Sequence, residues 1–166
     1  MTNQKNRIAL WTAMLDADYQ KRYWHRKAGK FTYWDRRIQV VLALSSSAAV
    51  FTALSDLEYI ALWKILTFIT ALIAVAWPFF NLGRRSFEMH ELSNLYHGLE
   101  IHYESLWRKV DDSSFTDSEF HEQFDALKAK ELVIGKKIFD LPTDDKKLHL
   151  LCQKEVVNSR GLERNA

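Results

Sequence analysis

Two long stretches with almost no charge lie in the middle of the chain, and they constrain its fold more than any other feature. Residues 38–54 (IQVVLALSSSAAVFTAL) carry no charged side chain, and residues 60–82 (IALWKILTFITALIAVAWPFFNL) carry only Lys64. A helix needs about 20 apolar residues to cross the hydrocarbon core of a bilayer, with roughly 17 as the lower limit. The sequence therefore predicts a hairpin of two transmembrane helices, with a short outer loop at residues 55–59.

Basic residues border these stretches on one side only. Residues 1–37 hold nine Lys and Arg against three Asp and Glu, although the whole 166-residue chain has a net charge of only +2. Arg36 and Arg37 precede the first stretch, Arg84 and Arg85 follow the second, and the loop SDLEY holds two acids. Because basic residues gather on the cytoplasmic side, both termini are expected in the cytoplasm. The alternative, a pair of buried helices in a soluble bundle, predicts loops of mixed charge.

Aromatic residues precede both arginine pairs, in FTYWDRR (31–37) and WPFFNLGRR (77–85). Aromatic rings settle at the depth of lipid headgroups, so both segments are expected at the inner membrane interface. Pro78 removes a helical hydrogen bond, which predicts a kink near the inner end of the second span and a point where the helix can be gated.

The N-terminal region is expected to be helical from about residue 4 to residue 35. Apolar residues recur there every three or four positions, and the segment YQKRYWHRKAGKFTYW is both basic and aromatic. Such a helix either lies on an anionic membrane surface or packs its aromatic face against the C-terminal helices. The apolar positions are Ile8, Trp11, Leu15, Tyr19 and Tyr23.

A heptad pattern follows the second stretch and predicts a long helix continuous with it. Its apolar face packs inside one chain, which is the commoner use of such a pattern, or it mediates self-association. The positions of this seam are Met89, Leu92, Tyr96, Leu99, Tyr103, Leu106 and Val110.

Two shorter helices are expected after residue 115. Thr116 and Glu119 have the spacing of a capping box, which begins a helix that ends near Leu141. Residues 143–145 (TDD) cap a last helix that runs to about Asn158. With no strand pattern, the chain is predicted to be an all-α membrane protein and a symmetric homo-oligomer. Its parts are a basic-aromatic helix (1–37), a transmembrane hairpin (38–82) and a cytoplasmic helical region (83–166).

No catalytic motif is found. The segments HELSN (90–94) and HEQFD (121–125) begin like the zinc motif HExxH, but each lacks the second histidine. The five glycines are scattered, and the one cysteine, Cys152, has no evident partner base. The sequence therefore predicts a protein that is not an enzyme and that holds no metal or cofactor.

Hydroxyl side chains within the two spans are candidates for lining a pore. Ser45 and Thr52 share one face of the first span, and Thr67 and Thr70 share one face of the second. Hydroxyls contact water or partly hydrated ions in channels, but they also bond to carbonyls of their own helix. Both roles are compatible with the sequence.

The lead-in YWHRKAGKFTYWDRR, the serine-rich first span, the acidic turn and WPFFNLGRR followed by a long helix resemble the SLATT family, whose members are two-transmembrane effectors of bacterial defence systems. The likeness covers about residues 15–110. It implies an inner-membrane protein that oligomerises into an ion-conducting pore and depolarises the membrane on infection. It also implies control by a cyclic nucleotide or oligonucleotide from a partner nucleotidyltransferase, or by a partner protein.

Basic residues outside the spans would contact such an anionic ligand, unless they are simply solvated or face lipid. A different class of function, a non-conducting anchor that recruits a soluble partner through its C-terminal helices, fits the same sequence. The candidates for anion contact are Arg22, Arg26, Lys27, Lys30, Lys136, Lys137, Lys146 and Lys147.

Overall fold

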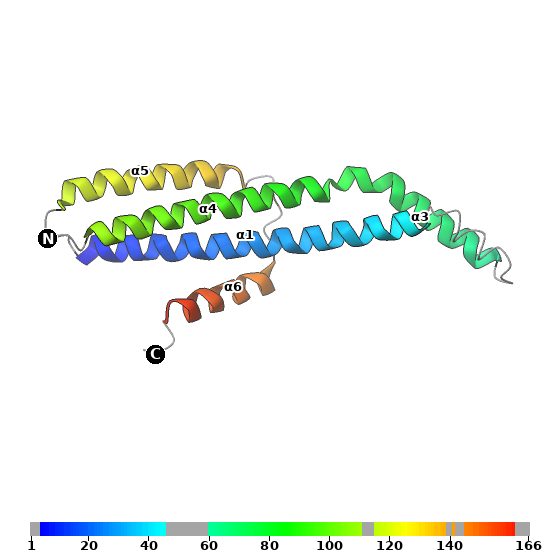
Figure 1. The fold of residues 1–166 in the computed structure, drawn as a ribbon, viewed down its shortest axis with the longest axis horizontal. Helices are drawn as coiled ribbons and strands as arrows, with labels where there is room; N and C mark the ends of the chain where they lie inside the picture. The colour runs from blue at the N-terminus through cyan, green and yellow to red at the C-terminus, as the bar shows by residue number, and fades with distance from the viewer. Residues whose placement is uncertain (1–3, 46–59, 111–114, 139–140, 142–144, 162–166) are drawn as a thin grey trace. The chain divides into compact units, whose positions relative to one another are not determined.

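The structure is a computed structural model that describes residues 4–45, 60–110, 115–138, 141 and 145–161 (Figure 1). These residues form helices and no strand, which confirms the all-α prediction for this part of the chain. The chain divides into two compact units, unit 1 (Met1–Ala28 with Phe87–Ala166) and unit 2 (Gly29–Ser86). The helices are α1 (Gln4–Ser45), α3 (Ile60–Phe80), α4 (Leu82–Val110), α5 (Asp117–Lys136) and α6 (Lys146–Ser159).

The heptad seam of α4 forms the centre of unit 1. All seven predicted seam residues, from Met89 to Val110, are buried within the single chain. Their neighbours include aromatic residues of the other helices: the ring of Tyr103 lies 6.2 Å from that of Phe124 on α5. The seam is therefore used for packing inside one chain, one of the two alternatives that the sequence left open.

The buried face of α1 differs from the predicted one. Ile8 is exposed, and Trp11 and Leu15 are only half-buried, so this part of the predicted face is wrong. The pattern of large apolar residues was misleading because small side chains allow α1 to approach α4 closely, and they carry little signal in a hydropathy pattern. The buried residues of α1 are Leu10, Ala13, Met14, Ala17, Asp18, Tyr23, Trp24, Lys27 and Ala28.

Two further helices complete unit 1, with α5 running along α4 and α6 along α1 (Figure 1). The predicted capping box of α5 is confirmed: the Glu119 backbone N–H donates to Thr116 Oγ1, and the Glu119 carboxylate accepts from the Thr116 N–H. Helix α5 ends at Lys136, earlier than predicted. Helix α6 begins after Asp145, whose carboxylate accepts the N–H of Leu148.

Unit 2 consists of the last part of α1, α3 and the first residues of α4. The predicted uninterrupted passage from the second stretch into α4 is wrong, because α3 ends at Phe80 and α4 starts at Leu82. Between them Asn81 has φ +45°, a left-handed conformation that asparagine tolerates better than most residues. The break thus falls three residues after Pro78, which itself lies within α3.

The start of α4 lies beside α1 within unit 2. The hydroxyls of Thr32 and Ser86 are 2.6 Å apart. One turn further along α1, the Asp35 carboxylate comes so close to Gly83 that a Cβ there would lie 3.6 Å from Oδ2. These contacts hold the two arginine pairs, residues 36–37 and 84–85, at the same level of unit 2.

Within the described part of the chain, no helix is both long enough and apolar enough to cross a membrane. Residues 46–59, which contain more than half of the first predicted span and the whole predicted loop, lie outside the described residues. The transmembrane hairpin therefore stays a prediction.

Candidate functional site

A buried carboxylate on α1 is the starting point of the most unusual polar cluster in the described residues. Asp18 is only 1% exposed. Arg22, one turn later on the same helix, donates from Nε to Oδ1 at 2.7 Å and from one terminal nitrogen to Oδ2 at 3.2 Å. Burial alone would raise the pKa of Asp18, but the Arg22 hydrogen bonds and the charge of Lys21 outweigh it and hold that pKa below its ordinary value.

Helix α4 contributes a second buried carboxylate. Glu100 is 6% exposed, and its Oε2 accepts from Lys21 Nζ at 2.6 Å. Lys21 Nζ also lies 3.2 Å from Asp18 Oδ1, so one ammonium joins the carboxylates of two helices. His97 Nδ1 lies 3.3 Å from the same Glu100 oxygen. Lys21 is thus the link between α1 and α4.

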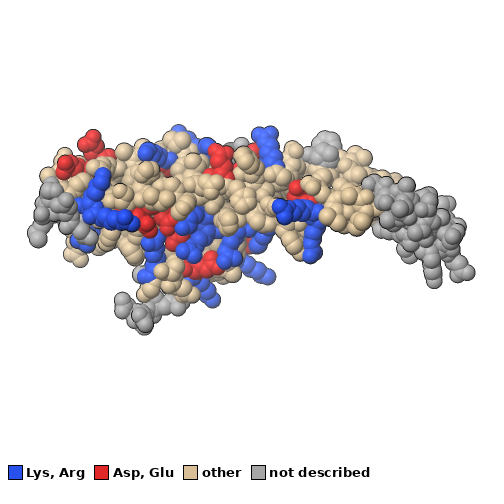
Figure 2. All heavy atoms as spheres, in the orientation of Figure 1, with Lys and Arg blue, Asp and Glu red and all other residues tan. Residues whose placement is uncertain are grey.

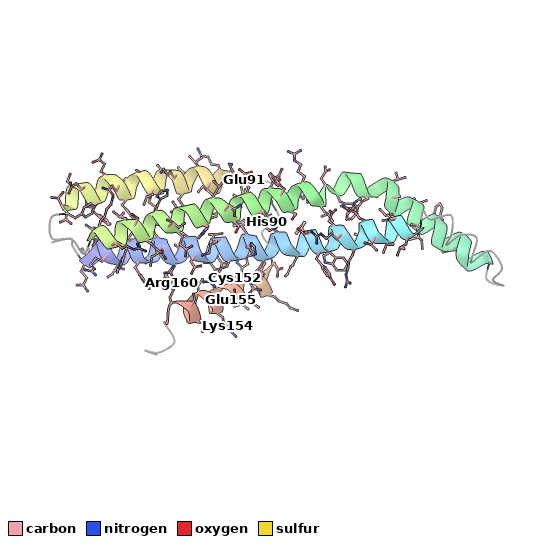
Figure 3. All side chains as sticks on the ribbon, viewed as in Figure 1. His90, Glu91, Cys152, Lys154, Glu155 and Arg160 are labelled. Atoms are coloured by element: carbon pink, nitrogen blue, oxygen red, sulfur yellow. The ribbon has the colours of Figure 1, made fainter. Side chains whose placement is uncertain are left out.

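Helix α6 closes this network with Arg160, which directly follows its last turn (Figure 3). Arg160 donates to Glu100 Oε1 at 2.9 Å and to Glu104 Oε1 at 3.2 Å, and its Nε lies 3.5 Å from Asp18 Oδ2. The three carboxylates of Asp18, Glu100 and Glu104 are balanced by three cations. We call these six residues (Asp18, Lys21, Arg22, Glu100, Glu104 and Arg160) the polar network.

Polar contacts beside the network also hold α6. Arg22 donates to Ser159 Oγ at 3.1 Å, and Arg26 forms an ion pair with Glu155. Figure 2 shows the resulting mixture of basic and acidic side chains over α6. Because α6 buries only Leu148, Cys152 and Val156, these charged contacts carry much of its attachment.

The interior of unit 1 holds a second polar group, centred on Tyr103. Its hydroxyl donates to Glu131 Oε2 at 2.9 Å, and Lys128 Nζ lies 2.8 Å from the same oxygen. Burial, followed by the negative charge of Glu131, raises the pKa of Tyr103 well above its usual range. Tyr103 therefore stays a neutral donor, and this group joins α4 to α5 without a chemically reactive member.

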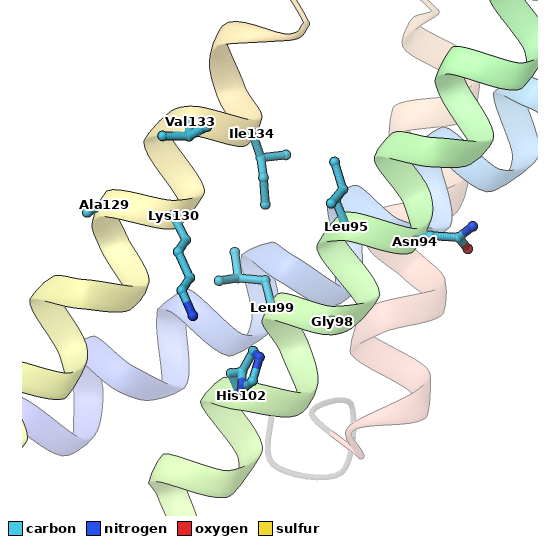
Figure 4. A pocket seen from close by; sticks show the side chains of 9 residues that line it. All are labelled: Asn94, Leu95, Gly98, Leu99, His102, Ala129, Lys130, Val133 and Ile134. Atoms are coloured by element: carbon cyan, nitrogen blue, oxygen red, sulfur yellow. The ribbon is translucent and has the colours of Figure 1, made fainter.

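Two hollows open on the surface of unit 1. The larger, about 530 Å³, lies between α4 and α5, where Leu95, Leu99 and Ile134 form an apolar floor with Lys130 and His102 at its edge (Figure 4). The smaller, about 400 Å³, borders the polar network. The residues that line it all carry polar groups: Lys21, Arg22, His25, Ser93, Asn94 and His97.

The predicted anion-contacting residues do not gather at one site. Lys27 is 4% exposed and donates to the Tyr23 hydroxyl at 2.9 Å, so its ammonium belongs to the core. Lys137 pairs with Glu91 at 2.7 Å. Lys136 is exposed at the end of α5, Lys146 and Lys147 are exposed at the start of α6, and Lys30 is exposed in unit 2. Of the predicted residues, Arg22 belongs to the polar network, and Arg26 lies one turn further along α1, where it pairs with Glu155.

The predicted pore-lining residues are less fully described. Thr70 is half-buried on α3. Ser45 and Thr67 belong to α1 and α3, but the structure does not describe the environment of their side chains, and Thr52 lies outside the described residues. Their role stays a prediction.

Most residues of the polar network were not predicted from the sequence. The pair Asp18 and Arg22 had a recognisable signal, since the i, i+4 spacing places the two on one helix face. Glu100 and Arg160 had none, because Glu100 meets Lys21 from 79 residues away and Arg160 meets Asp18 from 142 residues away. Arg160 also lies beyond the predicted end of the last helix, which was placed at about Asn158.

Among the described residues, no three His, Cys, Asp or Glu side chains cluster in a way that would hold a metal ion. Comparison with known protein families, characterised proteins and solved structures finds nothing that matches this chain. The functional conclusion therefore depends on the chain's own geometry and on the resemblance given above.

Proposed function

We propose that the protein is a membrane effector of bacterial antiviral defence whose unit 2 inserts into the inner membrane as a two-helix hairpin. Several copies associate there and form an ion-conducting pore. Unit 1 and both termini stay in the cytoplasm, where a nucleotide or oligonucleotide signal from a partner nucleotidyltransferase controls the pore. The resemblance to the SLATT family suggests this role, and the surface of unit 2 supports it.

The single observation that carries the proposal is the exposure of apolar side chains on every side of α3. From Phe68 to Ala76 each side chain is exposed except Thr70, which is half-buried. At about 25 cal/mol for each Å² of apolar surface, the large side chains concerned represent on the order of 10 kcal/mol of unfavourable contact with water. They are Val40, Val41, Leu44, Ile65, Phe68, Ile69, Leu72, Ile73, Val75 and Phe80.

The basic residues of unit 2 fit the same orientation. Arg36, Arg37, Arg84 and Arg85 are all exposed, and the hydrogen bond between Thr32 and Ser86 places the two segments that carry them side by side. Arg37 also lies over the ring of Tyr33, 4.2 Å from its centroid. A belt of arginines and aromatic rings at one level is the arrangement expected at a cytoplasmic membrane interface.

Self-association is best assigned to unit 2. The heptad seam of α4 is already buried within the chain, so it offers no free apolar surface to a second copy. The exposed side chains of α3 offer such a surface. Two spans per chain can enclose a conducting path only when several copies combine. Small residues on the first span would favour close approach of helices.

The proposal is tested by placing the purified full chain in vesicles of phosphatidylcholine and phosphatidylglycerol and measuring K⁺ flux. Flux is expected, and replacing Ser45, Thr52, Thr67 and Thr70 with valine is expected to reduce it. As a matched control, Thr12, Ser105 and Ser118, which are exposed in unit 1, are replaced with valine and leave the flux unchanged.

The possible results separate the two classes of function. Stable insertion without flux in any ligand state would identify a non-conducting anchor and would refute the pore. Recovery of the chain in the aqueous phase after vesicle flotation would refute membrane insertion altogether.

A further inference from the structure

The smaller hollow of unit 1, between α1 and α4, has the size and lining of a ligand site. Its volume of about 400 Å³ falls within the range of roughly 300–1,000 Å³ that is usual for small-molecule pockets. All six lining residues carry polar groups, and two of them, Lys21 and Arg22, are cationic, although the apolar parts of these side chains form most of the lining surface.

Part of the donor capacity in this hollow is already used. Lys21 serves Asp18 and Glu100, and Ser93 Oγ donates to the backbone carbonyl of Lys21 at 3.0 Å. Arg22 uses its Nε and one terminal nitrogen for Asp18 and Ser159.

The remaining hydrogen-bond donors belong to residues that line the hollow. No described residue accepts a hydrogen bond from the second terminal nitrogen of Arg22, from the side-chain amide of Asn94 or from Nε2 of His97. The ring of His25 meets only that of His90, at 5.6 Å between centroids. Four donors from two helices therefore face one space without acceptors among the described residues.

The carboxylates near the hollow are neutralised and do not repel an anion. Asp18, Glu100 and Glu104 are balanced by Lys21, Arg22 and, from α6, Arg160. What the hollow presents to solvent is the outer side of Lys21 and Arg22 with imidazole and amide groups. An anion with several acceptor oxygens would satisfy these donors together.

We propose that this hollow binds the phosphate group of a small ligand, with Arg22, Asn94, His25 and His97 donating to its oxygens. The assignment rests on the proposed function in one respect: it names the place where a nucleotide signal would act. The same phosphate chemistry is offered by a soluble nucleotide and by a lipid headgroup.

The site is coupled to α6 through the polar network. A phosphate that attracts Lys21 and Arg22 competes with Asp18 and Glu100, and these carboxylates are the ones that hold Arg160. Arg22 also holds Ser159. Ligand binding at Arg22 therefore competes with this one contact at the end of α6.

The test is calorimetric titration of the full chain in detergent with inorganic phosphate and with AMP, at one fixed pH. Saturable binding is expected, because an anion with several oxygens accepts from these donors together. Asn94→Leu, and separately His25→Gln with His97→Gln, are expected to weaken binding at least tenfold.

Two control variants keep the test specific. His102→Gln removes a histidine of α4 that lines the other hollow, and Lys154→Gln removes an exposed charge of α6. Both are expected to bind as the original chain does. Circular dichroism of each variant shows whether the helices are kept, and the exposed positions of Asn94 and His97 favour this.

Flotation with vesicles of phosphatidylcholine containing phosphatidic acid, compared for the chain and Asn94→Leu, identifies the source of the phosphate. If Asn94→Leu weakens binding to vesicles only, the site is assigned to a lipid headgroup. If it weakens binding in the titration only, the site is assigned to a soluble ligand. Absence of binding in both, or binding that ignores the three substitutions, overturns the inference. K⁺ flux without phosphate binding would refute this site but not the proposed pore. Phosphate binding without K⁺ flux would refute the proposed pore but not this site.

Discussion

The two units are built from the same kind of helix, yet they treat their apolar residues in opposite ways. In unit 1 the regularly spaced apolar residues of α4 are buried, and most of the exposed side chains are polar or charged. In unit 2 the apolar residues of α3 are exposed in every direction. A helix that is apolar all round is stable only when something apolar surrounds it, and unit 2 supplies no such surroundings itself. The difference teaches that unit 1 is folded by its own core, whereas unit 2 depends on lipid or on further copies.

The largest expected effect comes from leucine truncation in the two units. Leu92→Ala leaves a cavity at a position that is 2% exposed, so it is expected to lower the free energy of unfolding of unit 1 by about 3 kcal/mol. Leu72 lies in unit 2 and is 55% exposed. Leu72→Ala is therefore expected to change the free energy of unfolding of the chain by less than about 0.5 kcal/mol. Urea unfolding followed by circular dichroism measures both, and equal losses would erase the contrast between the units.

Removing Arg160 tests how α6 is held. Arg160→Ala leaves Glu100 and Glu104 without this partner, and we expect a loss of about 2 kcal/mol, less than for a fully buried pair because the arginine is partly hydrated. Lys154→Ala, which removes a solvent-exposed charge of the same helix, serves as the control and is expected to be neutral. Hydrogen exchange of the α6 amides measures the attachment. Unchanged protection in Arg160→Ala would show that apolar contacts alone hold the helix.

The lowered pKa of Asp18 predicts a specific response to acid. A carboxylate whose pKa is lower in the folded than in the unfolded state stabilises the fold above its ordinary pKa, and this stabilisation is lost as the pH falls through the lower, folded value. Unit 1 should therefore lose part of its unfolding free energy between pH 5 and the acid range. Asp18→Asn is expected to be less stable at pH 7 and to lose less on acidification. A parallel pH dependence of both proteins would contradict the assignment.

A smaller effect is expected at the start of α5. Thr116→Ala removes the side chain that accepts the Glu119 N–H, which costs about 1 kcal/mol at typical helix N-caps. Thr116→Ser keeps the acceptor and is expected to retain most of the stability. Thermal unfolding of the two variants compares them directly, and equal melting temperatures would mean that the cap contributes nothing.

Local patterns were enough to predict much of unit 1. The spacing of Leu92, Tyr96 and Leu99 identified the buried face of α4, and the pair Thr116 and Glu119 identified the start of α5. In each case the residues that form the signal lie within a few positions of one another, and the signal depends on helix geometry alone.

Features that need contacts between distant residues were not predictable in this way. No local pattern indicated that Asp18 or Lys27 would be buried, because their surroundings form only when the helices pack. It also favoured Pro78 as the point where the helix changes, whereas the break falls at Asn81, whose left-handed backbone ends α3. Proline marks a lost hydrogen bond, but a neighbouring residue that tolerates positive φ decides where the helix stops.

The most direct test of membrane insertion is the accessibility of a nitroxide spin label on the full chain in vesicles. Labels at Leu72→Cys on α3 and at Leu150→Cys on α6 are compared, since both positions are exposed, and Cys152 is buried and stays in place. We predict that the label on α3 meets oxygen dissolved in lipid but not a water-soluble nickel chelate, and that the label on α6 behaves in the opposite way. Equal access of the nickel chelate to both labels would contradict the account.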